Sequence, residues 1–480
     1  YINDGNWKFH DVARAAGVDL SGLASTGALL ADVNGDGSLD LLVSALGGPN
    51  TLLLNDGHGR FTEDTAYPGR TSRAGSTTMT LADIDGSGPL DLYVGNYKSY
   101  TVNDLYSPHQ RAFDQVVKRT GPKSFEVVEP YRKDYRVVIR EDLEAAILVQ
   151  RADPDWFYRN DGHGHFTPEP IAQNPRFLDE AGQPLAEEPE DFTLAARFYD
   201  VNGDGAPDLY VANDFEDPDR FWINDGQGRF RLLPWLAQRT TSNAAMAIDF
   251  GDINRDGNVD FFEVDMLSRD TRLLRTQIPT HTALPKQPGM IEDRPQLQRN
   301  TLFLNRGDGT FAQIAELAGV AASGWSWSTL FLDVDLDGYE DLLVGTGNRW
   351  DFMDADTQNK FRNQLANLDW RQQRMLHPQL AVPNYAFRNR GDLTFDDVSD
   401  RWHFSAGPDI SHGMAAADLD GDGDLDVVVN RLGAPALVLR NDATAPRLAV
   451  RLRGKSPNTE GVGAKVRVRG GAVPLQEREI

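Results

Sequence analysis

Asp418-Leu419-Asp420-Gly421-Asp422-Gly423-Asp424-Leu425-Asp426 is one of six copies of a nine-residue pattern that decides the fold of this chain. In each copy Asp stands at positions 1 and 9, Asp or Asn at position 3, Asp or Ser at position 5, and Gly at position 6. An apolar run such as Val427-Val428-Val429 follows, so each copy is expected to lead into a β-strand. The copies begin at Asp32, Asp83, Asp200, Asp252, Asp333 and Asp418.

The spacing of this pattern matches the needs of a calcium ion, which takes about six to eight oxygen ligands. Side chains at positions 1, 3, 5 and 9 and the backbone carbonyl of position 7 can surround one ion, and Gly at position 6 permits the sharp turn. Acidic turns that merely solvate strand ends are the alternative, and six copies with one spacing argue against it. About six structural calcium ions are therefore expected. The predicted ligands are Asp32, Asn34, Asp36, Ser38 and Asp40; Asp83, Asp85, Ser87, Pro89 and Asp91; Asp200, Asn202, Asp204, Ala206 and Asp208; Asp252, Asn254, Asp256, Asn258 and Asp260; Asp333, Asp335, Asp337, Tyr339 and Asp341; and Asp418, Asp420, Asp422, Asp424 and Asp426.

Charge and composition narrow the function class of this chain of 480 residues, which has a formal net charge of −24 and no cysteine. The negative charge argues against nucleic acid or an anionic membrane as a partner, and no run approaches the roughly 18 apolar residues of a membrane span. Disulfides, zinc–thiolate sites and cysteine nucleophiles are excluded. Because calcium modules outside the cell bind at about 0.1 to 1 mM, the loops favour a secreted, cell-surface or periplasmic location.

A second motif follows the acidic loops and completes a four-stranded unit. It joins two apolar runs through Asn-Asp-Gly or Asn-Arg-Gly, which is a hairpin signal. Each unit is expected to hold four strands, with the acidic loop between the first two and the hairpin between the last two. Repeated four-stranded units predict an all-β protein with the fold of a β-propeller. The motif occurs at residues 53–61, 158–166, 222–230, 303–311 and 387–395.

The spacing of the loops predicts the number of blades. Asp32 and Asp83 are separated by the length of one bare blade, and the longer intervals contain insertions between the second and third strands. Residues 1–9 match a third and fourth strand without a preceding loop, so seven blades are expected, with six as the alternative. The propeller is assigned to residues 1–445, and residues 446–480 to a partial C-terminal β module in which 447–452 and 464–469 alternate basic and apolar residues.

Three insertions, at about residues 97–155, 267–299 and 349–383, should lie on the face opposite the acidic loops and cap it. Residues 140–148 have the composition of a helix, and residues 363–374 are expected to be helical as well. The first insertion is locally basic and aromatic, which suits an acidic glycan or a neighbouring subunit. The alternative is that its tyrosines pack onto the blades below. The residues concerned are Tyr97, Tyr100, Tyr106, Tyr131, Tyr135, Arg132, Lys133, Arg136 and Arg140.

The repeats resemble those of the FG-GAP or VCBS family, calcium-binding propellers also found in integrin alpha subunits, over about residues 1–445. Residues 454–458 and 461–466 resemble the start of an ASPIC/UnbV domain, a combination carried by bacterial proteins similar to cartilage acidic protein 1. The resemblance implies an extracellular protein that binds partners and has no established reaction. The chain departs from the family pattern at Ser87, where Asp is usual, and at Arg255, which stands beside the ligands of the fourth loop.

Function is expected on the capped face, where second-strand ends and fourth-to-first connections meet. Aromatic and Arg side chains at such a rim are typical contact anchors, whereas Asn and Asp there also commonly cap turns. The candidate binding residues are Asn96, Tyr97, Asn213, Asp214, Asn243, Asp265, Trp325, Trp327, Asn348, Arg349, Trp350, His412, Asn430 and Arg431.

Two function classes remain open at this point. The leading hypothesis is a calcium-stabilised binding or scaffold propeller in a secreted or surface assembly, with a protein or glycan partner. The competitor is a carbohydrate-active lyase or hydrolase that uses His281, His377 or His412 as a base with an arginine partner. The sequence contains no nucleophile elbow, zinc motif or phosphate loop, which favours binding over catalysis.

Overall fold

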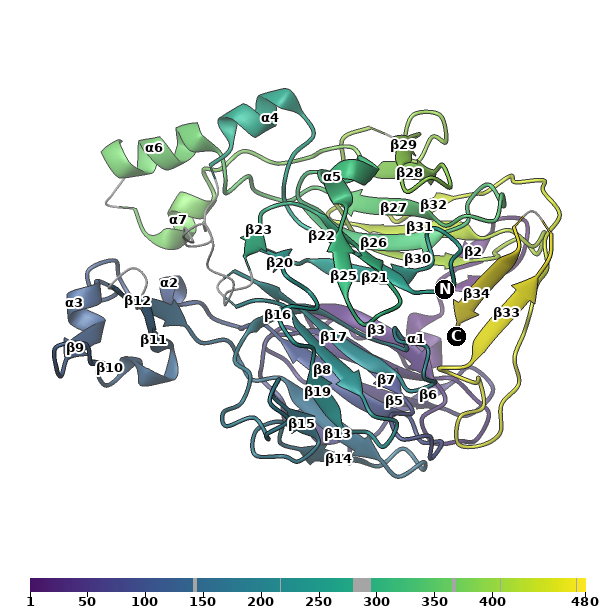
Figure 1. The fold of residues 1–480 in the computed structure, drawn as a ribbon, viewed down its shortest axis with the longest axis horizontal. Coiled ribbons are helices and arrows are strands. Elements are labelled where there is room, and N and C mark those ends of the chain that lie inside the picture. The colour runs from purple at the N-terminus through teal and green to yellow at the C-terminus, as the bar shows by residue number, and fades with distance from the viewer. Residues whose placement is uncertain (141–144, 216, 279–294, 365–367, 406, 472) are drawn as a thin grey trace.

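Among the described residues, the six larger sheets are arranged as the blades of a propeller, and smaller two-stranded sheets accompany them (Figure 1). The structure is a computed structural model that describes residues 1–480 except 141–144, 216, 279–294, 365–367, 406 and 472. Six blades are the second of the two numbers predicted from the sequence. The described helices include none that is long and apolar enough to cross a membrane.

Each blade begins with a strand that ends at an acidic loop, as predicted from the repeats. Blade 1 is β3 (Ser25–Ala31), β4 (Asp40–Ala45), β5 (Thr51–Asn55) and β6 (Phe61–Glu63), and blade 2 is β7 (Ser76–Ala82), β8 (Asp91–Asn96), β13 (Trp156–Asn160) and β14 (Phe166–Glu169). Blade 3 is β16 (Phe192–Tyr199), β17 (Asp208–Asp214), β18 (Arg220–Asn224) and β19 (Phe230–Leu232), which β15 (Phe177–Leu178) joins as a parallel fifth strand.

The remaining blades follow the same order. Blade 4 is β21 (Ala247–Gly251), β22 (Asp260–Val264), β24 (Thr301–Asn305) and β25 (Phe311–Gln313), and helix α5 (Ala315–Ala318) follows it. Blade 5 is β26 (Ser326–Leu332), β27 (Asp341–Thr346), β28 (Tyr385–Asn389) and β29 (Phe395–Asp397). Blade 6 has three described strands, β30 (Ser411–Ala417), β31 (Asp426–Arg431) and β32 (Leu437–Leu439). At the N-terminus β1 (Ile2–Asn3) pairs with β2 (Phe9–His10), and α1 (Ala13–Ala16) follows.

The core lies between neighbouring sheets rather than inside one sheet. Large buried rings interlock there, as where Phe261 of blade 4 stacks on Phe303 at 4.6 Å and meets Tyr210 of blade 3 at 5.2 Å. Such aromatic contacts bury much apolar area and fix the angle between sheets. Five apolar clusters of this kind join blades 1 to 2, 2 to 3, 3 to 4, 4 to 5 and 5 to 6.

The three insertions lie together at one end of the propeller, opposite the acidic loops, as predicted (Figure 1). The first contains α2 (Val102–Leu105), α3 (Phe113–Val116), β9 (Val117–Arg119), β10 (Phe125–Val127), β11 (Tyr135–Arg140) and β12 (Ala145–Gln150). The second contains α4 (Thr271–Thr276) and β23 (Gln296–Leu297), which pairs with β20 (Thr241–Ser242). The third contains α6 (Ala355–Gln364) and α7 (Trp370–Arg374). The cap is held together by contacts between insertions, including Arg371 with Asp104 at 3.8 Å and Ile278 N–H with Met353 O at 2.7 Å.

Two predictions of local structure were wrong. Within 140–148, the described residues 140 and 145–148 are strand and not helix, because β12 pairs with β11 through the register Val137↔Leu148 and buries Val149, while 141–144 lie outside the described residues. Tertiary pairing overrides helix propensity here. Residues 447–452 form no strand, whereas β33 (Lys465–Arg469) was predicted and pairs with β34 (Leu475–Glu479). Helix was correctly expected for residues 363–364 and 370–374, whereas 368 and 369 are not helical and 365–367 lie outside the described residues.

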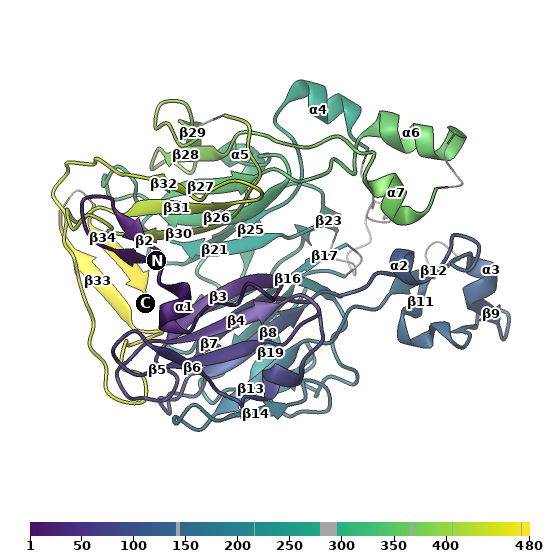
Figure 2. The same ribbon diagram turned by 180° about the vertical axis from the view of Figure 1, so that it is seen from behind.

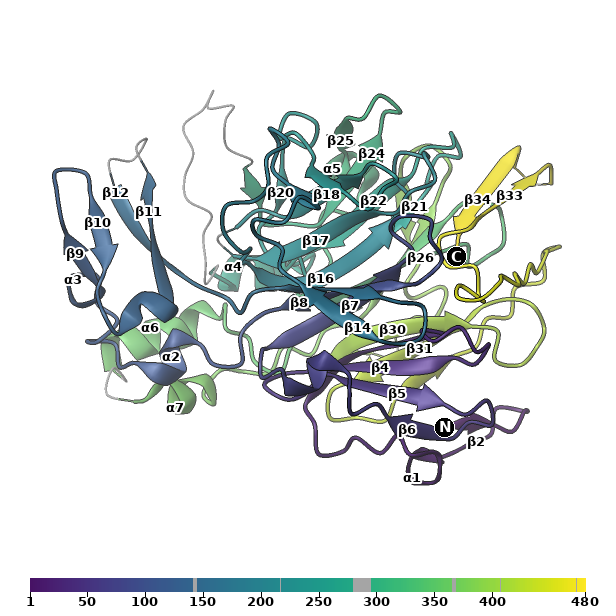
Figure 3. The same cartoon turned by 90° about the horizontal axis from the view of Figure 1, so that it is seen from below.

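The C-terminal hairpin lies over the end of the propeller that carries the acidic loops (Figures 1 and 3). Thr459 Oγ1 donates to Asp32 Oδ2 at 2.5 Å, Lys465 Nζ lies 2.9 Å from Asp200 Oδ2, and Arg478 lies 3.1 Å from Glu340. Residues after 446 therefore neutralise part of the acidic end, which explains why basic residues recur there.

Candidate functional site

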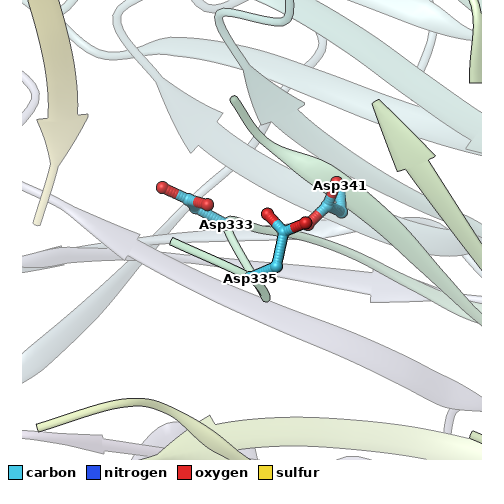
Figure 4. A group of neighbouring side chains, drawn as sticks. All are labelled: Asp333, Asp335 and Asp341. Carbon is cyan, nitrogen blue, oxygen red and sulfur yellow. The ribbon is translucent and has the colours of Figure 1, made fainter. Parts of the chain in front are cut away.

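The acidic loops gather carboxylate oxygens closely enough to hold a cation. In the fifth loop one oxygen each of Asp333, Asp335 and Asp341 lies within 4.8 Å of the others, and Figure 4 shows Asp335 between the other two. Asp418, Asp420 and Asp426 form the same arrangement in the sixth loop. Hard oxygen ligands in this number suit calcium better than a transition metal.

Several of these oxygens are buried without a hydrogen-bond partner. They include Oδ1 of Asp83, Oδ1 of Asp333 and Oδ1 of Asp335. A buried carboxylate that no donor meets is costly unless a cation compensates it. Burial also raises the pKa of Asp333 to about 6 and the pKa of Asp341 to about 8. The donor set therefore fits a divalent cation that would restore full ionisation.

The aspartate at position 9 of each loop also ties strands together. Asp341 Oδ2 accepts the Val334 N–H at 2.9 Å, and Oδ1 accepts the Asn389 N–H at 2.9 Å. In all six blades the last Asn of the third strand donates its backbone N–H to this carboxylate in the same way. Position 9 is thus part of the blade with or without metal, whereas positions 1, 3 and 5 belong to the loop.

Arginine compensates the loops that carry Asp at position 3. Arg159 lies 2.8 Å from Asp85 in the second loop, and Arg388 lies 2.5 Å from Asp335 in the fifth. Arg440 meets Asp420 of the sixth loop in the same way. The loops with Asn at position 3 have Leu54, Ile223 and Leu304 at the place of the arginine. The arginine thus brings the net charge of the fifth and sixth loops to that of the loops with Asn at position 3. The second loop, which has both an arginine and Ser87 at position 5, keeps the least negative charge.

Most polar residues predicted for the binding face serve the fold. Asn96 donates from Nδ2 to Pro154 O at 2.7 Å, and Asp265 Oδ2 accepts from Ser242 Oγ at 2.6 Å. Tyr97 donates to Asp214 at 3.0 Å, and Arg431 pairs with Asp409 at 2.8 Å. Asn213, Asp214, Asn243 and Asn348 are buried, while Arg349 and Asn430 are exposed. The alternative, that strand-end polar residues cap turns, therefore describes the buried members of the set.

Three ring-bearing members of the set, Trp325, Trp327 and His412, lie together in a ladder of rings. Tyr97 instead packs on Phe192, and Trp350 lies beside the Arg349 guanidinium. Trp327 stacks on His412 with centroids 5.0 Å apart and on Trp325 with centroids 6.3 Å apart. The third insertion extends the ladder, because Phe352 lies 6.1 Å from Trp325 and 5.2 Å from His377. We call Trp325, Trp327, His412, Phe352 and His377 the aromatic ladder.

The aromatic ladder carries polar atoms that no protein group satisfies. Trp325 Nε1 and His412 Nε2 are buried without a hydrogen-bond partner, whereas Trp327 Nε1 donates to Gly347 O at 2.7 Å. The Trp325 and His412 nitrogens are themselves buried, so the ring surface that a ligand could reach belongs to the half-buried Trp327, His412 and Phe352. Phe352 and the nearby Arg374, whose guanidinium lies 4.8 Å over that ring, were missed from the sequence because they belong to a non-repeating insertion.

Of the predicted bases, His377 has an arginine in its neighbourhood, because Arg374 lies over Phe352, the ring next to His377. His412 and His377 stand at opposite ends of the aromatic ladder, with Trp327, Trp325 and Phe352 between them. His377 Nδ1 lies 2.8 Å from Asp351 O, and burial lowers the pKa of both histidines. His281 lies outside the described residues.

The first insertion is not a free basic patch. Tyr106 stacks against Tyr131 at 4.9 Å, and buried Tyr135 belongs to a small core made within the insertion itself. Arg132 lies near Glu126 at 3.8 Å, and Arg136 pairs with Asp217 of blade 3 at 2.5 Å. The tyrosines thus pack mainly within the insertion, apart from Tyr97, which packs on Phe192 of blade 3.

A buried carboxyl pair joins blades 3 and 4 beneath the cap. Glu263 and Asp219 are both buried, and Asp219 Oδ2 and Glu263 Oε1 have no hydrogen-bond partner. Burial raises the pKa of both groups, and the two negative charges raise the pKa of Asp219 further. Glu263 stands where the other five blades have valine.

Because Glu263 and Asp219 are buried together, we expect the free energy of unfolding to depend on pH. Because the folded-state pKa values are raised, the native state binds more protons, and the free energy of unfolding falls as pH rises above the ordinary carboxyl pKa of about 4. In saturating calcium, Glu263→Gln should reduce this fall by about 1 kcal/mol or more. Urea unfolding at a series of pH values above about 4 measures it, with Glu316→Gln on the exposed side of α5 as the control. An unchanged pH slope in Glu263→Gln would show that the pair is not protonated as expected.

Comparison with known proteins supports the repeat assignment. Residues 32–94, 200–262, 293–344 and 379–429 match the model of the FG-GAP-like repeat, and these segments contain all six loops. Cartilage acidic protein 1 of Mus musculus is 32% identical over 127 residues, which are 25% of this chain and 20% of that protein. The Homo sapiens protein is 31% identical over 127 residues, which are 25% of this chain and 19% of that protein. The chain spans about a fifth of the length of these relatives.

Solved structures with a similar arrangement include two proteins of low sequence identity. A lectin of Agrocybe aegerita, studied for its recognition of non-reducing terminal N-acetylglucosamine, has a TM-score of 0.40 and 15% identity, covering 90% of this chain and 84% of the lectin. The biofilm matrix protein Bap1 of V. cholerae has a TM-score of 0.33 and 9% identity, covering 88% of this chain and 79% of that protein. Sequence, strand order and repeat matches agree that this chain is a β-propeller built from FG-GAP-like repeats.

Proposed function

We propose that this protein is a secreted, cell-surface or periplasmic binding propeller, stabilised by calcium in its loops, that binds a glycan on its capped face. The aromatic ladder is the observation that carries the glycan assignment. Its rings include the half-buried Trp327, His412 and Phe352, which offer apolar ring surface of the kind that sugar rings cover. A protein partner is the second candidate for the same face.

Calcium has a structural role in this proposal. The loops would hold it with the oxygens at positions 1, 3, 5 and 9 and the carbonyl at position 7, and its positive charge would allow the buried carboxylates to ionise together. The loops lie at the end of the propeller opposite the cap (Figure 1). The ion therefore acts on the junction between first and second strands and not on a ligand at the ladder.

The calcium that the loops would need supports the proposed location outside the cytosol. Twenty carboxylates stand at positions 1, 3, 5 and 9, and six calcium ions would offset twelve negative charges of a net −24. Six sites of the extracellular type would fill at about 0.1 to 1 mM calcium. The cytosol does not supply that concentration, so the proposal places the protein outside it.

The test of glycan binding uses the centre of the ladder. Wild type is screened against immobilised acidic and neutral oligosaccharides in millimolar calcium, and the strongest ligand is then titrated. Trp327→Ala should weaken that binding about tenfold or more, because the residue stacks on both Trp325 and His412.

Trp156→Ala is the matched control, since Trp156 is a partly exposed tryptophan on blade 2 that stacks on Tyr158. Equal binding by wild type and Trp327→Ala would contradict a glycan site on the ladder. A stoichiometric protein captured from the source organism's envelope fraction, and lost in Trp327→Ala, would replace the glycan by a protein partner.

Charge compensation predicts which loop binds calcium least tightly. Arg159 occupies two carboxylates of the second loop, Asp85 at 2.8 Å and Asp91 at 2.6 Å. Arg159→Leu, which copies the residue type of Leu54, should raise the calcium affinity of that loop about five- to tenfold by removing a partly buried positive charge. Calorimetric titration with calcium measures the dissociation constant of the weakest site. If Arg159→Leu leaves the calcium affinity of the weakest site unchanged, this arginine does not compete with calcium.

A further inference from the structure

Two arginines of the capped face are exposed and have no acidic partner among the described residues. Arg349 follows the end of β27, and Arg374 is the last residue of α7. Neither side chain forms an ion pair or a hydrogen bond with a described residue, although the chain has 72 acidic residues and only 48 basic ones. At the same rim of blade 6, by contrast, Arg431 pairs with Asp409 at 2.8 Å. Arg349 and Arg374 therefore differ from the arginines that serve the fold.

Carboxylates of the second and third insertions are held by neutral donors instead of by these arginines. Asp270, Asp354 and Asp369 each accept a backbone N–H at the start of α4, α6 or α7, all at 2.8 Å. Asp351 is buried and accepts from Gln277 Nε2 at 3.0 Å. None of these four carboxylates forms an ion pair with either arginine. Both guanidinium groups are therefore left for an anion that the described part of the chain does not supply.

Both guanidinium groups are stacked on aromatic rings. The Arg374 guanidinium lies 4.8 Å from the ring centroid of Phe352 and 5.8 Å from that of Trp370. The Arg349 guanidinium lies 5.3 Å from the ring of Trp350. Stacking fixes the plane of a guanidinium and leaves its N–H edge for a partner. Planar or multidentate anions such as carboxylate and sulfate take two parallel hydrogen bonds from that edge.

The two arginines flank the aromatic ladder. Arg374 lies over Phe352, whose ring is 6.1 Å from Trp325. Arg349 follows Gly347 by two residues, and the Gly347 carbonyl accepts the Trp327 Nε1–H at 2.7 Å at the other side of Trp325. Figure 2 shows α6 and α7 beside α4 at the end of the propeller opposite β33 and β34. The cations therefore stand on either side of the rings that carry the glycan proposal.

We propose that the capped face binds an acidic oligosaccharide. Carboxylate or sulfate groups of the sugar chain pair with Arg374 and Arg349, and its sugar rings cover the ladder between them. The ligand is an oligosaccharide and not a single sugar, because Trp325 and Phe352 separate Trp327 from Arg374. This inference rests on the proposed glycan function and adds the chemical class of the ligand.

The negative charge of the whole protein does not oppose this assignment. The acidic loops lie at the other end of the propeller (Figure 1), and charges farther apart than about 8 Å are largely screened at physiological ionic strength. At the capped face, hydrogen bonds between a guanidinium and an anion are roughly twice as strong as those between neutral groups. An acidic sugar therefore gains contacts that a neutral sugar of the same shape lacks.

The test compares acidic and neutral forms of the same sugars. The probes are uronic acid tetrasaccharides of several linkages, their carboxyl-reduced neutral forms, and these neutral forms carrying sulfate esters. Each is titrated calorimetrically into the full chain in millimolar calcium. At least one acidic tetrasaccharide should bind about tenfold or more tightly than its neutral form, and the two kinds of acidic probe show whether the arginines take carboxylate or sulfate. Equal affinity of every acidic and neutral pair would overturn the proposal.

Arginine variants assign the preference to these two side chains. Arg374→Gln should reduce the preference for the acidic form about tenfold, and Arg374→Lys should restore only part of it, because lysine keeps the charge without the planar fork. Arg371→Gln is the matched control, since Arg371 is on the same helix, is exposed and lies 3.8 Å from Asp104. It should keep the preference of the wild type.

The outcomes separate this inference from the glycan function on which it rests. A preference for the acidic form that survives in the double variant with Arg349→Gln and Arg374→Gln would overturn the arginine assignment. If Trp327→Ala nevertheless weakens that binding, the glycan function stands without it. Failure of the wild type to bind any of the tetrasaccharides would overturn both.

Discussion

Chelation of calcium is expected to lower the melting temperature of this protein by roughly 10 °C. If free calcium stands ten times above each dissociation constant, each site stabilises the native state by about 1.4 kcal/mol, and six sites contribute roughly 8 kcal/mol. That contribution rivals the whole stability of a typical domain. Calorimetry in millimolar calcium and in chelator measures the shift.

Magnesium at the same concentration is the control for ionic strength and divalent charge. It should recover little of the lost stability, because its smaller octahedral shell fits a wide loop of carboxylates and carbonyls poorly. Equal melting temperatures in calcium and in chelator would mean that the loops hold no ion that matters to the fold.

Two alanine substitutions in the fifth loop are expected to have different calcium dependence. Asp341→Ala should lower the free energy of unfolding by about 2 to 5 kcal/mol even in chelator, because Val334 and Asn389 N–H groups lose their acceptor in a buried place. Asp333→Ala should cost much less in chelator, since its carboxylate is buried with one oxygen unpaired. In calcium, Asp333→Ala should lose the contribution of one site, about 1.4 kcal/mol or more.

Urea unfolding of both variants, with and without calcium, separates these roles. Asp333→Ala that destabilises equally in both conditions would contradict metal binding at this loop. Asp341→Ala with no effect in chelator would contradict the structural role of position 9. Asp392→Ala, in the exposed turn between β28 and β29, is the matched control and should change little in either condition.

The blades were predictable because their determinants are local and repeated. Six loops with one spacing and a strand signal on either side specify a first strand, a loop and a second strand without any knowledge of distant contacts. The hairpin motif around Asn305 fixed the third and fourth strands in the same way. The N-terminal pair, β1 and β2, was also recognised from that motif alone.

What was missed depends on contacts between segments far apart in the sequence. Residues 140–148 have helical composition, but in the described part 145–148 pair with β11 as a strand. The aromatic ladder joins Trp325 and Trp327 of blade 5 to Phe352 of an insertion that has no repeat to reveal it. Asn160 ends the third strand of blade 2 and was visible in the repeated motif, but its acceptor in blade 1, Val33 O at 2.9 Å, could be identified only from coordinates.

The arginines beside the acidic loops could have been predicted from the sequence but were not. Asp at position 3 occurs with Arg159, Arg388 or Arg440 two strands later, and Asn at position 3 occurs with Leu or Ile there. The six repeats of this chain can be aligned with one another, and that alignment shows that Asp at position 3 occurs together with the arginine. Its physical reason, relief of repulsion among carboxylates, became evident when the ion pairs were seen.

The number of calcium ions bound per chain tests most directly whether the acidic loops are calcium sites. The chain is dialysed against millimolar calcium, and bound metal is counted by elemental analysis against protein concentration. One ion for each of the six loops is the predicted result, with the second loop the last to fill. A count near zero, or one unchanged by Asp333→Ala and Asp418→Ala together, would contradict it.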